Sequence, residues 1–91
     1  MKIDQQDNGK KGSFYIEHEG ERAAEMIYVW KGDKLVIEHT EVAEALRGKG
    51  AAKKMLMEAV AYAREHKKKI LPLCSYAASV FERTPEIRDV L

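Results

Sequence analysis

The sequence has a single cysteine, Cys74, among 91 residues. One cysteine excludes an internal disulfide and any metal cluster built from several thiolates. We therefore expect a chain that works in a reducing compartment, the cytoplasm, with Cys74 as a free thiol. His18 and His66 have no spacing typical of metal ligands, so no bound metal is expected.

An excess of charge of one sign is also missing. The chain has 16 Lys and Arg and 15 Asp and Glu, for a net charge of +1. Proteins that bind nucleic acid or anionic membranes are usually far more basic, so we expect neither partner. The basic runs 10–11 and 67–69 are interpreted as solvated charges. No apolar run approaches the roughly 18 residues of a membrane span, and the start, MKIDQQDNGKKG, lacks the apolar stretch of a secretion signal.

What is present is a balanced globular composition, with 45% hydrophobic and 34% charged residues. A chain of this length builds one modest core, so we expect a single domain over residues 1–91. No surplus apolar face is evident, which makes a monomer the expected state.

The first half of the chain reads as three strands, at 13–19, 22–31 and 35–40. They follow a turn-rich segment at 7–12. Their connections are short, so the three strands are predicted to form an antiparallel meander. Within the second strand, alternate residues are apolar or aromatic, as expected of a strand with one buried face.

The pattern then changes to helical spacing. Apolar residues recur every three or four positions from Ala51 to His66, which predicts an amphipathic helix. The apolar segment 70–74 reads as a strand that runs parallel to the third through a right-handed crossover. A short helix capped by Ser75 and a last turn at Thr84 and Pro85 complete the order β-β-β-α-β-α. The fold class is α+β with a mixed sheet.

The segment RGKGAA (47–52) lies between a strand and the start of the long helix. Backbone N–H groups are free at a helix start, and the helix dipole adds positive charge there. Two glycines permit close approach to the backbone, and Arg47 and Lys49 add charge. These features suit a phosphate or pyrophosphate, although a loop with solvated charges is the simpler alternative. The spacing fits neither a P-loop nor a Rossmann fingerprint.

Cys74 and His39 are the two candidates for chemistry. A thiol beside a helix N-terminus is a better nucleophile, but a free cysteine is often a small buried hydrophobe. His39 alternates with Leu35 and Ile37, so we predict that it shares their face. If the strands of His39 and Cys74 are parallel neighbours, both side chains lie at the sheet edge where ligands bind. A purely structural role for each remains the alternative.

At RGKGAA the chain resembles the GNAT acetyltransferase superfamily, whose signature is Gln/Arg-x-x-Gly-x-Gly/Ala. Arg47, Gly50 and Ala52 occupy the specified positions. The chain is most similar to the small YjdJ-type GNAT-like proteins, which lack the N-terminal helices of larger relatives. The likeness covers nearly the whole chain, in the segments MIYVWKGDKL (26–35), IEHTEV (37–42), LRGKGAAKKML (46–56) and ILPLCSYAASVFERTPEIRDVL (70–91).

This resemblance implies that two parallel strands splay apart and hold coenzyme A between them. The pantetheine arm would pair with backbone at Glu41, Val42 and Ala43. The pyrophosphate would lie on the loop residues Arg47, Gly48, Lys49, Gly50, Ala51 and Ala52. Ser75 and Tyr76 would flank the cofactor. Cys74 is the implied nucleophile and His39 its implied base.

The resemblance implies an acetyl-CoA-dependent N-acetyltransferase that acts on an unidentified amine, directly or through Cys74. Two alternatives remain at this point: a module that binds coenzyme A without transfer, and an interaction domain whose site is vestigial. An intact anion loop favours the first two over the third.

Overall fold

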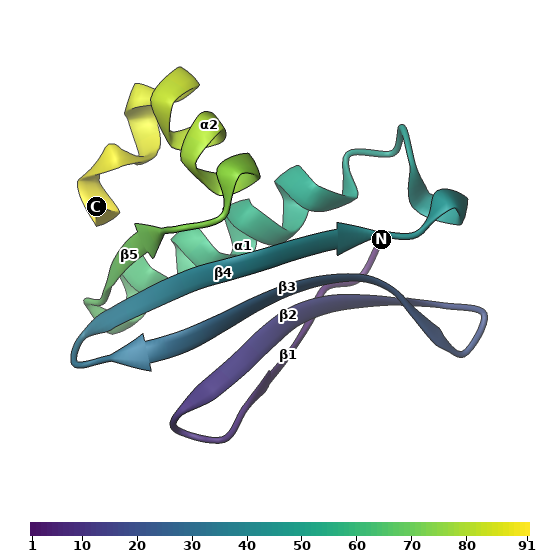
Figure 1. The fold of residues 1–91 in the computed structure, drawn as a ribbon, viewed down its shortest axis with the longest axis horizontal. Coiled ribbons are helices and arrows are strands. Elements are labelled where there is room, and N and C mark those ends of the chain that lie inside the picture. Colours follow the sequence, from purple (N-terminus) through teal and green to yellow (C-terminus); the bar gives the residue numbers. More distant parts are fainter.

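The computed structural model describes residues 1–91 as one five-stranded sheet with two helices (Figure 1). The strands are β1 (Asp4–Asp7), β2 (Lys11–His18), β3 (Glu21–Lys31), β4 (Lys34–Val42) and β5 (Lys69–Pro72). The helices are α1 (Ala51–His66) and α2 (Ser75–Arg83), with 3-10 segments η1 (Glu44–Leu46) and η2 (Pro85–Val90). The strands lie in chain order; β1 to β4 are antiparallel and β5 is parallel to β4. The predicted α+β class, meander and central helix are confirmed.

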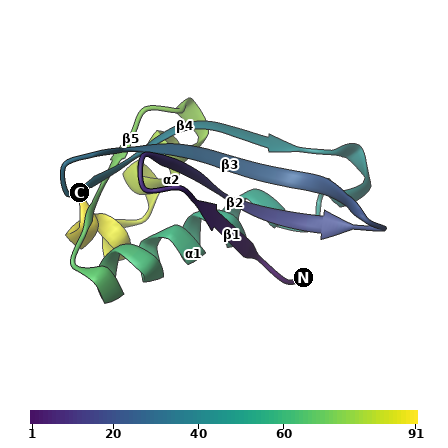
Figure 2. The same ribbon diagram turned by 90° about the horizontal axis from the view of Figure 1, so that it is seen from below.

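The core lies between the sheet and α1, which packs along one face of the sheet (Figure 2). Met26 and Tyr28 of β3 are fully buried against Met55 and Leu56 of α1, because each belongs to the apolar face of its element. The helix α2 and the segment η2 extend the same core beside β5. Neither helix is long and apolar enough to cross a membrane.

The strand β1 is absent from the sequence-based prediction, which treats only 7–12 as a turn. Its residues, DQQD, are polar, so no alternation marks them as a strand. Side chains hold it in place. The Tyr28 hydroxyl and the Trp30 indole N–H donate to the Asp7 carboxylate at 2.6 and 2.7 Å, and Gln5 donates to the Tyr28 hydroxyl at 2.8 Å. A buried tyrosine needs such a partner, and β1 supplies it.

Gly12 is required where β2 passes over this network. A Cβ at this position would lie 2.4 Å from the Gln6 carbonyl oxygen and 2.6 Å from the Tyr28 hydroxyl. We expect Gly12→Ala to lower the free energy of unfolding by about 3 kcal/mol, because backbone cannot give way easily. Urea denaturation measures this. As a control, Gly9→Ala introduces a Cβ into open space and should cost only about 1 kcal/mol, from its positive φ; equal losses would contradict the steric account.

Asp7 makes the stability of this network depend on pH. Burial alone would raise the pKa of Asp7, but hydrogen bonds from Tyr28, the Gly9 backbone and Trp30 together lower it below its ordinary value. A carboxyl whose pKa is lower in the folded state adds stability above about pH 4, its unfolded value, and loses it as the pH falls. The melting temperature should therefore fall further between pH 6 and pH 2 in the wild-type protein than in the Asp7→Asn variant. Parallel melting curves over that range would count against this role of Asp7.

Several predicted element boundaries shift. The strand β2 begins at Lys11 rather than Ser13, and β4 continues to Val42 rather than ending at Thr40. The strand β5 ends at Pro72, not at Cys74, because the backbone leaves the sheet there to enter α2. The two changes at β4 and β5 decide the geometry of the candidate site.

Candidate functional site

The loop between η1 and α1 is exposed and held at both ends by buried side chains. Leu46 and Ala51 are 4% and 2% exposed, whereas all four residues between them are exposed. Gly48 and Gly50 have φ of 76° and 73°, in the left-handed region that glycine adopts without strain. A Cβ at either glycine would meet nothing within 4 Å, so the space over the backbone is open. A ligand can therefore approach the main chain of this loop directly.

The first turn of α1 has no cap. Gly50 occupies the N-cap position, no side chain accepts a hydrogen bond there, and no acidic residue lies in the first turn. The N–H groups of Ala51, Ala52 and Lys53 have no backbone acceptor. The first backbone hydrogen bond of this turn is donated by the Lys54 N–H to the Gly50 carbonyl, at 3.0 Å. Three unpaired donors at the positive end of a 16-residue helix form a site for an anion. Arg47 and Lys49 belong to the same loop and are exposed.

The strands β4 and β5 part after Ile37. The last register pair joins Ile37 to Pro72, and the carbonyl of Ile37 then accepts hydrogen bonds from both Leu73 and Cys74, at 2.9 and 3.0 Å. Beyond this point β4 continues through Val42 with no neighbour on that side. The predicted splay of two parallel strands is present.

The parting leaves one edge of β4 with free backbone groups. The Ala43 N–H donates to the Ala23 carbonyl at 2.6 Å, so Ala43 faces β3. Because successive residues of a strand direct their N–H and C=O groups to opposite sides, those of Thr40 and Val42 point away from β3. Of the three residues predicted to contact a ligand through their backbone, Glu41, Val42 and Ala43, only Val42 directs its backbone groups to the open edge. Thr40, which sequence reasoning missed, joins it.

Cys74 lies where the two strands separate. Its Sγ accepts a hydrogen bond from the Ala77 N–H at 3.3 Å, so Cys74 is the N-cap of α2. The prediction that Ser75 caps this helix is wrong by one residue; Ser75 is exposed and begins the helix. The Thr40 hydroxyl lies 3.4 Å from the same sulfur. The Cys74 sulfur therefore has two hydrogen-bonding neighbours and lies at the N-terminus of α2.

His39 does not reach Cys74. Ile37 pairs with Tyr28 and His39 with Ile27, which leaves Glu38 as an extra residue, a β-bulge. The bulge reverses the alternation, so the prediction that His39 shares a face with Leu35 and Ile37 is wrong. The imidazole, 55% exposed, lies on the face away from α1, and its Nε2 is 2.9 Å from the Glu41 carboxylate. Thr40 takes the place beside Cys74 that the sequence assigned to His39.

Tyr76 lies in the first turn of α2, two residues after Cys74, and is half-buried. Burial raises the pKa of its hydroxyl above the usual value of 10; Arg83 partly opposes this rise and Cys74 adds to it. The phenol therefore keeps its proton at neutral pH.

A hollow of about 440 Å³ lies over the ends of β3 and β4. Glu25 and Glu41 pair across the two strands there, on the same face as His39. The full lining is Arg22, Ala23, Ala24, Glu25, Glu41, Val42 and Ala43. Arg22 neutralises Glu25 at 2.6 Å. This size is sufficient for a small organic ligand.

Comparison with known families and structures gives a consistent result. The family model described as GCN5-related N-acetyl-transferase matches residues 13–90. A GCN5-like protein from Staphylococcus aureus, solved by NMR, is 34% identical in sequence, and its structure matches with a TM-score of 0.73. The match covers 96% of this chain and 85% of that one. No curated protein matches the sequence.

More distant structures share the fold. The ribosomal-protein-alanine N-acetyltransferase from Brucella melitensis has a TM-score of 0.66 at 16% identity, over 85% of this chain and 62% of that one. The ribosomal-protein-S18-alanine N-acetyltransferase from Escherichia coli has a TM-score of 0.69 at 13% sequence identity. That match covers 88% of this chain and 54% of the Escherichia coli chain. The present chain thus spans only a little over half the length of these two enzymes.

Proposed function

The chain belongs to the GCN5-related N-acetyltransferase family, and from this premise we propose that it binds acetyl-CoA and transfers the acetyl group to an amine. The observation that carries the proposal is the parting of β4 and β5 after Ile37, with an uncapped helix N-terminus at the end of the longer strand. In this proposal the free edge of β4, the loop before α1 and the Cys74 thiol would all contact the same cofactor.

We assign the pyrophosphate to the loop. The N–H groups of Ala51, Ala52 and Lys53 would donate to its oxygens, and the open glycines at 48 and 50 would let it reach them. Arg47 and Lys49 would add charge at the rim. The amides of the pantetheine arm would pair with the backbone of Thr40 and Val42 as an added strand would, since these backbone groups have no partner in the sheet.

Cys74 would then lie beside the acetyl thioester. In the covalent route the Cys74 sulfur attacks the acetyl carbon, the bond from that carbon to the coenzyme A sulfur breaks, and coenzyme A leaves as the thiol. The Tyr76 hydroxyl, which is protonated at neutral pH, would donate its proton to the leaving sulfur and recover the proton that the Cys74 thiol loses, so the step gains and loses no net proton. An amine then attacks the acetyl-cysteine, which yields the amide and restores the Cys74 thiol.

The acceptor amine would approach from the face of the sheet that carries His39. The Glu41 carboxylate lies 2.9 Å from Nε2 and would hold the imidazole by accepting a hydrogen bond from the Nε2 proton, so Nδ1 of His39 would accept the proton that the amine loses on attack. The hollow beside Glu41 offers room for this acceptor and the negative charge of the Glu41 carboxylate, since Glu25 is paired with Arg22. His39 thus serves the acceptor in this scheme, and not Cys74.

The test is an acetyl-transfer assay against a panel of small amines and peptides, one with an N-terminal alanine, read by product mass. His39→Gln should lower transfer by about 100-fold, the contribution of a general base, while acetyl-CoA binding stays unchanged. His18→Gln, an exposed histidine of β2, is the matched control. Binding of acetyl-CoA without product from any amine would favour a binding module and overturn the transferase proposal.

A further inference from the structure

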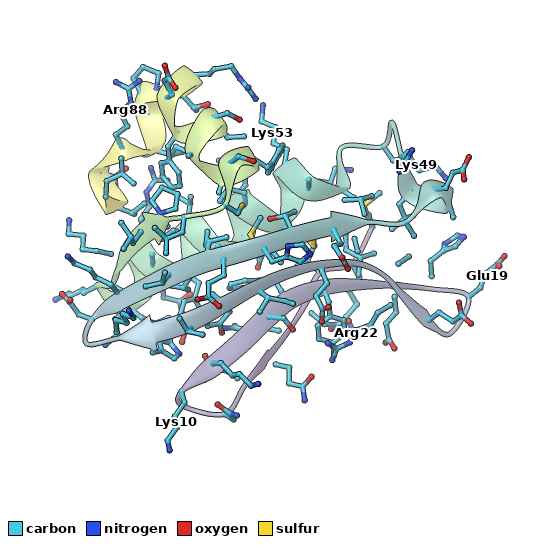
Figure 3. All side chains as sticks on the ribbon, viewed as in Figure 1. Lys10, Glu19, Arg22, Lys49, Lys53 and Arg88 are labelled. Atoms are coloured by element: carbon cyan, nitrogen blue, oxygen red, sulfur yellow. The ribbon has the colours of Figure 1, made fainter.

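The end of the sheet opposite the loop gathers lysines that are far apart in the sequence. They come from the β1–β2 turn, the β3–β4 turn and the connection from α1 to β5: Lys10, Lys11, Lys31, Lys34, Lys67, Lys68 and Lys69. The strand pairing brings them together, since Lys31 pairs with Lys34 and Lys34 with Lys69, and the Lys10 carbonyl accepts from Trp30 at 2.8 Å. Figure 3 shows Lys10 and Lys49 at opposite ends of the molecule. We call this set of seven side chains the lysine end.

The lysine end carries a local positive charge that the composition hides. Six of its lysines are exposed and Lys68 is half-buried. Of the nearby acids, Asp89 is paired with Arg64 at 2.7 Å and Asp7 accepts hydrogen bonds from Tyr28 and Trp30. Asp33, in the β3–β4 turn, is exposed and offsets one of the seven lysine charges. Because the net charge is only +1 overall, most of the 15 acidic residues that balance the charge must lie outside this end. A surface that is positive at one end attracts polyanions whatever the average charge.

Aromatic rings run through the lysine end. Trp30 and Tyr62 have centroids 6.2 Å apart, and Tyr62 and His66 4.2 Å apart, so three rings form a row across β3 and α1. The Lys68 ammonium lies 5.9 Å from the Trp30 ring. Beside the row is a hollow of about 310 Å³ lined by Asp7, Gly9, Trp30, Gly32, Tyr62 and Lys68. Trp30 and Tyr62 are only half-buried and so present ring surface to solvent.

We propose that the lysine end binds single-stranded nucleic acid, with phosphates on the lysines and a base stacked in the hollow against Trp30 and Tyr62. Sequence-tolerant single-strand sites combine these two features, a positive track and aromatic rings. An anionic membrane would use the lysines but leaves the row of rings without a role. The expectation that nucleic acid is no partner rested on the net charge, which averages over both ends of the molecule.

This site is separate from the proposed acetyl-CoA site. Lys34 begins β4 and Val42 ends it, a separation of about 26 Å at 3.3 Å per residue. Binding at one end therefore does not block the other, and the two proposals fail or succeed independently.

Trp30 is the only tryptophan, so its fluorescence reports on the stacking step. Oligothymidylate of about 12 nucleotides should quench it with a dissociation constant of order 10⁻⁴ to 10⁻⁶ M. Heparin, which has charge but no bases, and phosphatidylserine vesicles should give no comparable quenching. Absence of quenching by the oligonucleotide, or association with heparin or vesicles at equal or higher affinity, would overturn the proposal.

Paired variants test the placement. Lys31→Gln with Lys34→Gln removes two phosphate contacts, which should flatten the dependence of log K on log salt by about 1.4, at about 0.7 per contact for single strands. Lys2→Gln with Lys54→Gln makes the same charge change at exposed positions of the N-terminal segment and of α1, outside the lysine end and outside the proposed cofactor contacts, and should leave the slope unchanged. If the control pair lowers affinity and slope as much as the first pair, the site is not the lysine end.

Discussion

Replacement of Gly50 by glutamate is expected to abolish stabilisation by acetyl-CoA. A carboxylate at the N-cap of α1 would stand where the pyrophosphate is proposed to lie, and two like charges 4 Å apart repel by about 4 kcal/mol at an effective dielectric constant of 20. We therefore expect affinity to fall by 100-fold or more. At a ligand concentration of about 100 times the wild-type dissociation constant, stabilisation should fall from about 2.7 kcal/mol to about 0.4 kcal/mol. Thermal melting followed by Trp30 fluorescence gives this as a shift of roughly 10 °C or more in wild type that nearly disappears in the variant.

Gly32→Glu is the matched control for this experiment. Gly32 also has a positive φ, 62°, and a Cβ there would also meet nothing within 4 Å. Both variants thus pay a similar backbone cost of about 1 kcal/mol, but Gly32 lies in the β3–β4 turn, far from the loop. Gly32→Glu should keep the full shift with acetyl-CoA. A normal shift in Gly50→Glu, or an equal loss in both variants, would place the cofactor elsewhere.

Cys74→Ser should eliminate the acetyl-enzyme while leaving the fold intact. Serine is a good N-cap, so its hydroxyl should replace the sulfur as acceptor for the Ala77 N–H. It is a far weaker nucleophile than a thiol at neutral pH. After incubation with acetyl-CoA, intact mass should show one added acetyl group on wild type and none on the variant. Amine acetylation should fall by about two orders of magnitude or more.

Cys74→Ala separates the chemical loss from the capping loss. It removes both the nucleophile and the acceptor for Ala77, so it should also lower the free energy of unfolding by about 1 kcal/mol relative to Cys74→Ser. Both variants should lack the acetyl-enzyme. An acetyl adduct retained in both variants would contradict the covalent route. Full transfer rates in both variants with no adduct would show that the amine attacks acetyl-CoA directly.

The elements with strong periodic patterns were predictable. The apolar face of α1, from Ala51 to Ala63, and the alternation along β3 are dictated by burial against each other. The loop around Gly50 was predictable as well, because two glycines beside a helix start and two basic residues form a local signal. These features are set by residues close together in the sequence.

The geometry around Cys74 was not predictable from local pattern. An extra residue at Glu38 reverses the side of the sheet on which His39 lies, and nothing in the segment VIEHT marks it as a bulge. The same bulge places Thr40 beside Cys74. The strand β1 was not predictable for a related reason. Its stability comes from hydrogen bonds with Tyr28 and Trp30, more than twenty residues away in the sequence.

A ¹H–¹⁵N NMR titration of the wild-type protein with acetyl-CoA tests the central claim most directly. If acetyl-CoA binds along the open edge of β4, the largest shifts should fall on the amides of Thr40 and Val42, on residues 48–53, and on Cys74. The amide chemical shifts of the β1–β2 and β3–β4 turns, at the opposite end, should not change. Large shifts confined to those turns, or none anywhere at millimolar acetyl-CoA, would contradict the proposed cofactor site and with it the acetyltransferase mechanism.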